Sequence, residues 1–240
     1  MKFFCFLILP AFLFSFVRAQ DLDNYNILWQ EQSRNSGESM PCGGGDIGLN
    51  VWVENGDILF YMARSGTFDE NNLFPKLGRV RLSLSPNPFR EGTAFRQELK
   101  LRGGYVEISG TKGGHTVRID VWVDVFRPVV HLTVNSSKPV KARASYESWR
   151  TRDRELKGRE KFGTSYKWAD EEVITGKDQV SFRGNGVLFY HRNSDSTVFD
   201  RSVSQQGLAP VKAALWNPLT NLTFGGLMQG RNMQPAGTVE

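Results

Sequence analysis

Residues 40–72 read MPCGGGDIGLNVWVENGDILFYMARSGTFDENN, and this stretch decides the fold class. After a glycine-rich entry come two runs suited to β-strands, joined by Glu54-Asn55-Gly56-Asp57. An Asn-Gly pair between such runs is a strong hairpin signal, because both central positions of a type I′ turn need positive φ. The second run ends in a polar loop, Arg64–Asn72. The sequence therefore predicts a tight antiparallel hairpin that turns at Asn55-Gly56.

Alternation of apolar and polar residues continues outward from this hairpin. The longest stripe places Val117, Ile119, Val121, Val123 and Val125 on one face. We expect strands at 46–53, 58–62, 77–84, 95–101, 105–109, 116–125, 128–134, 140–149, 186–191 and 223–229. Short strands at this spacing predict an all-β fold, an antiparallel β-sandwich or supersandwich. Residues 40–149 should then contain no helix of three or more turns.

The glycine-rich entry, the strand and the Asn-rich acidic loop resemble a family of secreted bacterial glycosyl-hydrolase-like proteins. The resemblance is to their N-terminal β-sandwich domain, a domain of unknown function. A more distant similarity is to the N-terminal β-domain of α-L-fucosidases with a six-hairpin (α/α)6 barrel. The resemblance is clear from Trp29 to Phe89 and loose elsewhere. It implies a carbohydrate-processing context and a chain truncated before a helical barrel, which carries the catalytic carboxylates of such enzymes.

The strand-end loop supplies the candidate site that this resemblance implies. Its substrate-binding candidates are Arg64, Asp69, Glu70 and Asn71. Such a loop could face the barrel and touch sugar hydroxyls, because carboxylate and amide groups can bond two hydroxyls at once. The alternative is structural: Asp69 or Asn71 caps a turn and Arg64 pairs with a carboxylate. Neighbours on a strand point to opposite faces, so Asp69 and Glu70 make a poor acid–base pair, and we predict no catalytic residue in this chain.

Residues 1–19 have the features of a secretory signal peptide. Lys2 precedes an apolar run, Phe3–Val17, and Ala19 is a small residue suited to cleavage. The run is shorter than the roughly 20 residues needed to span a bilayer. We predict export to the periplasm or extracellular space, with no membrane attachment after cleavage. The mature β-sandwich domain would span 20–240, with a charged excursion at about 150–180.

Charge, histidine and cysteine usage argue against several classes of function. The chain has 30 Lys and Arg against 25 Asp and Glu, and losing Lys2 and Arg18 leaves 28 − 25 = +3. Because the signs are mixed along the chain, we expect no nucleic-acid partner. The histidines at 115, 131 and 191 share no metal-ligand spacing, so we expect isolated histidines, no metal and no other cofactor. The one mature cysteine, Cys42, predicts a packed thiol rather than a reactive one.

Two functional hypotheses of different classes remain. The first is a non-catalytic N-terminal module that supports a helical barrel in a secreted glycoside-hydrolase-like protein. The second is a free-standing carbohydrate-binding module; in both, an oligosaccharide or polysaccharide is the expected partner. A supporting module should expose a broad apolar face, whereas a binding module should show an aromatic platform rimmed by polar groups. The dispersed tryptophans favour packing over such a platform. A third hypothesis, a small hydrolase, needs a convergent carboxylate pair that the sequence does not reveal.

Overall fold

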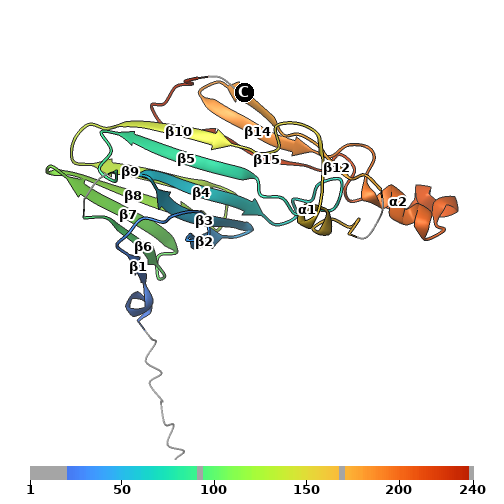
Figure 1. The fold of residues 1–240 in the computed structure, drawn as a ribbon, viewed down its shortest axis with the longest axis horizontal. Helices are drawn as coiled ribbons and strands as arrows, with labels where there is room; N and C mark the ends of the chain where they lie inside the picture. Colours follow the sequence, from blue (N-terminus) through green and yellow to red (C-terminus); the bar gives the residue numbers. More distant parts are fainter. Residues whose placement is uncertain (1–20, 91–93, 168–170, 238–240) are drawn as a thin grey trace, which may run out of the picture.

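The computed structural model describes residues 21–90, 94–167 and 171–237, and most of their regular structure is β-strand (Figure 1). The strands are β1 Ile27–Trp29, β2 Met40–Gly44, β3 Ile47–Glu54, β4 Asp57–Arg64, β5 Gly78–Ser85, β6 Arg96–Lys100, β7 Tyr105–Lys112, β8 His115–Val123, β9 Val130–Ser136, β10 Lys141–Glu147, β11 Arg154–Glu155, β12 Ile174–Thr175, β13 Gln179–Arg183, β14 Gly186–Arg192 and β15 Thr223–Gln229. The helical segments are η1 Leu22–Tyr25, α1 Arg159–Phe162, α2 Val198–Gln205 and η2 Ala209–Ala214. The predicted signal peptide lies outside the described residues.

The strands form antiparallel sheets whose inner faces share one core. Sheet I has the order β1-β6-β7-β8-β9, and sheet II has the order β10-β5-β4-β3-β2. Sheet III, β13-β14-β15, also contributes to the core, since Phe189 of β14 stacks on Tyr146 of β10 with ring centroids 4.0 Å apart. Within described residues 40–90 and 94–149 no helix occurs. The predicted all-β antiparallel sandwich is therefore confirmed.

The hairpin that decides the fold has the predicted turn. Asn55 and Gly56 adopt φ of 52° and 80°, and Glu54 pairs with Asp57 across the two-residue loop. Both positive φ values suit a type I′ turn, whose twist matches that of the flanking strands. The turn sets the register that sends Val51 and Val53 into the core.

The long stripe on β8 ends earlier than the sequence predicts. Val117, Ile119, Val121 and Val123 are buried, as expected, but Val125 is 60% exposed. The strand stops because the Asp124 carboxylate accepts the backbone N–H groups of residues 126 and 127 and turns the chain. The expectation that the strand continues to residue 125 is therefore wrong.

The glycine-rich entry allows β2 to lie against the end of β8. A Cβ on Gly44 would stand 3.0 Å from the Val123 carbonyl oxygen, and Gly45 adopts a φ of 58° next to Val125. Close backbone packing therefore explains these glycines. Cys42 lies beside them, half-buried, and burial raises the pKa of its thiol, so it is a packed cysteine.

The described part of the charged excursion, residues 150–167 and 171–180, contains the short elements β11, α1 and β12 and the first residues of β13. Helix α2 lies between β14 and β15 of sheet III in the sequence and was not predicted. Its start carries a capping box in which Thr197 and Asp200 bond each other's backbone N–H, a signal that the sequence does contain. None of the helices among the described residues is long and apolar enough to cross a membrane.

Candidate functional site

The side chain of Asp69 caps the turn in the polar loop after β4. Its Oδ1 accepts the backbone N–H groups of Asn71, at 3.0 Å, and of Leu73, at 2.8 Å. This is the turn-capping role expected of an Asp side chain. The carboxylate is buried, and its Oδ2 has no hydrogen-bond partner among the described residues. Burial, reinforced by the charge of Glu70, raises the pKa of Asp69 to about 6.

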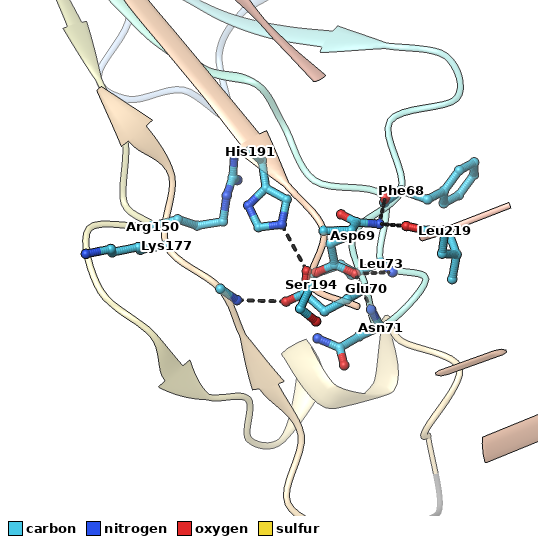
Figure 2. Close-up of polar contacts among 12 residues, drawn as sticks. Phe68, Asp69, Glu70, Asn71, Leu73, Arg150, Lys177, His191, Ser194 and Leu219 are labelled. Carbon is cyan, nitrogen blue, oxygen red and sulfur yellow. Dashed lines mark hydrogen bonds and ion pairs between the residues drawn. The ribbon is translucent and has the colours of Figure 1, made fainter. Parts of the chain in front are cut away.

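Glu70 points into the protein and binds a buried histidine. Its Oε1 accepts the Gly176 N–H at 2.8 Å, and its Oε2 lies 3.0 Å from His191 Nε2 (Figure 2). The other ring nitrogen of His191, Nδ1, lies 3.3 Å from Asp178 Oδ1. His191 comes from β14, so this contact joins the loop after β4 to sheet III.

Asp178 extends the contact to Arg150, which is also buried. Arg150 Nε donates to Asp178 Oδ1 at 2.8 Å, and the Ser148 hydroxyl donates to Oδ2 at 2.6 Å. Arg150 Nη1 donates to the Lys76 carbonyl oxygen at 2.9 Å. We call Glu70, His191, Asp178 and Arg150 the buried ionic network. Its members come from the loop after β4, sheet III and the charged excursion.

The charges of the buried ionic network alternate and compensate one another. Burial alone would lower the pKa of His191, but hydrogen bonds to Asp178 and Glu70 and their negative charges outweigh it and raise this pKa to about 9. Burial alone would raise the pKa of each carboxyl. The bonds and charge of His191, joined at Asp178 by Arg150, hold both pKa values below their usual range. At neutral pH two positive groups thus face two negative ones, which is the arrangement that buried charges require.

Amide side chains complete the junction around this network. Asn71 Nδ2 donates to the Ile174 carbonyl oxygen at 2.7 Å. Asn193 Nδ2 donates to the carbonyl oxygens of Phe68 and Leu219, at 3.0 Å each (Figure 2). The Val198 N–H at the start of α2 donates to the carbonyl oxygen of residue 70. Hydrogen bonds therefore join the polar loop to the charged excursion, to His191 of sheet III and to the start of α2.

Of the predicted site residues, the structure brings three together and leaves one apart. Asp69, Glu70 and Asn71 are buried neighbours whose bonds go to protein groups. Arg64 lies at the surface and pairs with Asp46, with Nε and Oδ2 2.7 Å apart. This geometry matches the structural alternative, a capped turn and a paired arginine.

Sequence reasoning did not find the other members of the network. The expectation of isolated histidines is wrong: His191 binds two carboxylates, His115 bonds the Ser136 hydroxyl at 2.7 Å, and His131 stacks on Trp122. One signal was available, a histidine inside the apolar run GVLFYH, where a buried ring needs polar partners. Those partners lie far away in sequence, so the pattern could not name them.

The bonds of this arrangement join segments of the fold to one another. Both carboxylates of the network lie within hydrogen-bond distance of His191, and both residues are buried. Across residues 21–90, 94–167 and 171–237, no group of three or more His, Cys, Asp or Glu could hold a metal ion. The buried ionic network can therefore hold the loop after β4, sheet III and the charged excursion together at one end of the sandwich.

Stability should depend on the protonation of His191. A group whose pKa is raised on folding contributes stability that is complete below its unfolded pKa and is lost as pH rises through the folded value. For His191 the window runs from about 6.5 to about 9. We expect the free energy of unfolding to fall across this window by on the order of 1–3 kcal/mol, as measured by urea denaturation at several pH values.

The matched control for this pH profile is His191→Gln, which keeps polar atoms but does not titrate. Its stability should be lower than that of the wild type at pH 6.5 and should change less between pH 6.5 and 9.5. Wild-type and His191→Gln profiles with the same slope in this window would contradict the assignment.

Comparison with known proteins identifies a matching family. The family model DUF5703_N, described as Domain of unknown function (DUF5703), matches residues 28–240. No curated protein matches the chain.

Proposed function

The chain belongs to the DUF5703 N-terminal domain family, and we propose that it serves as the non-catalytic β-sandwich module of a secreted glycoside-hydrolase-like protein. In this proposal a helical domain of the same protein supplies the catalytic carboxylates and acts on an oligosaccharide or polysaccharide. The module supports that domain and helps to form the entrance to its site.

The observation that carries the proposal is the uneven distribution of exposed apolar side chains. Ten of the nineteen large apolar side chains that are exposed among the described residues belong to segments at the end of the sandwich where β4 finishes, which we call the apolar end. Its members are Phe68, Phe74, Val125, Phe126, Phe162, Ile174, Leu208, Val211, Leu215 and Trp216. A large apolar patch that faces solvent is typical of an interaction surface.

Several contacts place these segments at one end. The register pairs Ile47 with Arg64, and Gly44 touches Val123, so the loop after β8 lies beside the loop after β4. Figure 1 shows α1 and α2 gathered beyond the same end of the sheets. The opposite end is formed by the turns at 55–56, 86–90, 113–114 and 137–139. Among the described residues, these turns expose no large apolar side chain.

The candidate loop has a specific part in this proposal. Asp69, Glu70 and Asn71 hold its shape from inside, so the loop can present Phe68 and Phe74, whose rings lie 5.5 Å apart, to a partner. Arg64, which is partly exposed, is the member of the predicted set best placed to reach a bound saccharide. A free-standing carbohydrate-binding module remains the second candidate, favoured by the exposed side chain of Trp149, which follows the end of β10.

The experiment that tests the proposal compares sugar release by the chain alone and by a longer protein that includes the helical domain. The mature chain should release no sugar from aryl glycosides, because in this proposal the catalytic carboxylates belong to the helical domain. Linked to the helical domain, it should release sugar. Turnover by the chain alone that Glu70→Gln abolishes would contradict the proposal and support the small-hydrolase hypothesis.

A further inference from the structure

Three aromatic side chains form a row across the outer face of sheet I. The register pairs Tyr105 of β7 with Trp122 of β8, and Trp122 with His131 of β9. Residues that pair across an antiparallel sheet share a face. The chain neighbours Val106 and Val121 are buried in the core, so the three rings point away from it, and each is half-buried. We call Tyr105, Trp122 and His131 the aromatic row.

This face of sheet I is open to solvent. Positions farther along it, Thr116, Arg118, Thr133 and Asn135, are exposed. Figure 1 shows α1 and α2 beyond one end of the sheets, at the apolar end. The aromatic row lies near that end, because the loop after β8 begins two residues after Trp122. A ligand on the row would therefore border the surface where the proposed function places the helical domain.

The stacked pair within the row is fixed before any ligand arrives. The ring centroids of Trp122 and His131 lie 4.6 Å apart, and their planes differ by 13°. This spacing is close to the ~4.8 Å between neighbouring strands, so the two rings stand side by side out of the sheet. His131 thus covers one face of the indole, and the other face is directed toward β7. A ring held in this way lowers the entropic cost of binding.

The second face of the indole is available on the side of Tyr105. The ring of Tyr105 turns toward Gly103, where an added Cβ would stand 2.6 Å from it. Among the described residues, His131 is the one aromatic ring stacked on Trp122, and no cation lies over the indole. The apolar C–H face of a sugar ring can stack on such an electron-rich surface. The row crosses three strands, about 10 Å, which suits a short oligosaccharide.

Two carboxylates lie beside the aromatic row on the same face. Glu107 and Asp120 pair across β7 and β8, two positions from Tyr105 and Trp122. Arg118 bridges them: its Nη2 lies 3.0 Å from Glu107 Oε2, and its Nε donates to Asp120 Oδ1 at 3.0 Å. Each carboxylate uses one oxygen in this bridge. Within the described residues the second oxygen of each is left to accept hydroxyl groups of a ligand.

The charges on this face compensate one another, which favours a neutral ligand. Besides the bridge at Arg118, Glu98 Oε2 lies 2.5 Å from Arg96 Nη2 and 2.8 Å from Lys100 Nζ. The paired groups are thus three carboxylates and three cations. A charged ligand would have to compete with these pairs. The hydroxyl groups of a neutral sugar can bond to the same groups without separating them.

We propose that the aromatic row, with Glu107, Arg118 and Asp120, forms a binding surface for a neutral oligosaccharide. One sugar ring stacks on the open face of Trp122, its hydroxyl groups bond to Asp120 and Glu107, and the next unit reaches Tyr105. This inference rests on the proposed carbohydrate context, and it names the surface and the class of saccharide. The surface would hold a polysaccharide beside the helical domain.

The test screens the mature chain on an array of neutral and acidic oligosaccharides, and calorimetric titration then measures the affinity of each probe that binds. We expect a neutral oligosaccharide of glucose, xylose, mannose or galactose units to bind, with an affinity that added salt does not change. Trp122→Ala should weaken this binding roughly 10-fold or more, as truncation of a central tryptophan often does. Asp120→Asn, which keeps the packing of the row, should weaken it by about 3- to 10-fold, because a bond to a charged group is lost.

The matched control is Trp149→Ala, which removes a tryptophan that is 46% exposed and packs on Tyr61 of sheet II. It should leave binding unchanged, and melting temperatures establish which variants are folded. If Trp122→Ala does not fold, Asp120→Asn decides the result alone.

The inference is overturned if no neutral probe binds, if only acidic probes bind, if the folded Trp122 and Asp120 variants bind like the wild type, or if Trp149→Ala weakens binding as much as Trp122→Ala. Sugar release by the longer protein is a separate measurement. Release without binding at the aromatic row would contradict this surface alone, whereas binding without release would contradict the proposed function alone.

Discussion

The Asp178→Asn variant is expected to lose about 3–5 kcal/mol of unfolding free energy, the usual cost of breaking a buried ion pair by removing one partner. Asp178 stands between Arg150 and His191, and each of them donates to its carboxylate. Asparagine keeps the shape of the side chain but removes its charge. Two buried positive groups would then face Glu70 alone. Urea denaturation at pH 7 measures the loss.

The matched control is Asp46→Asn, which removes a carboxylate from the surface pair with Arg64. Exposed pairs contribute about 0–1 kcal/mol, so this variant should unfold close to the wild type. A loss from Asp178→Asn no larger than that from Asp46→Asn would show that the buried ionic network does not hold the loop.

The fold could be predicted from the sequence because the apolar–polar alternation of each strand is visible within the strand itself. The alternation in 77–84 and the Asn55-Gly56 turn each fix a face or a register without knowledge of distant residues. The strands that the sequence predicts, such as β5 and β15, lie within a few residues of their expected ranges, whereas the strands β1, β2, β11, β12 and β13 were not predicted. The exception at Val125 has a local cause, a side-chain cap by Asp124, which competes with strand extension.

The candidate site could be predicted only in part, because burial and distant partners decide its role. The polar loop was found from its composition, yet Glu70 and His191 are separated by 121 positions. Nothing near Glu70 in the sequence indicates that its carboxylate turns inward. Only the fold brings His191 of β14, Asp178 and Arg150 together with the loop, and it buries Glu70 among them instead of leaving it on a binding surface.

The largest effect on function is expected at the apolar end. If a helical domain packs there, Trp216→Ala should weaken association of the chain with that domain by about 2–4 kcal/mol, because buried tryptophans are frequent interface hot spots. This corresponds to roughly 30- to 1000-fold in Kd. Val211→Ser should weaken it as well, since serine cannot replace the apolar contact. Both residues are exposed in the chain alone, so neither change should alter its melting temperature much.

The control for this association is Leu227→Ser on the outer face of sheet III. Leu227 is 48% exposed and Val211 is 49% exposed, so the two changes remove similar apolar surface. Leu227 lies on β15, away from the apolar end, and its replacement should leave association unchanged.

Calorimetric titration of the mature chain with the separately produced helical domain tests the central claim most directly. The account predicts a saturable complex that Trp216→Ala and Val211→Ser weaken and that Leu227→Ser preserves. Absence of a complex, or equal weakening by all three changes, would contradict the claim that this module supports a helical domain through its apolar end.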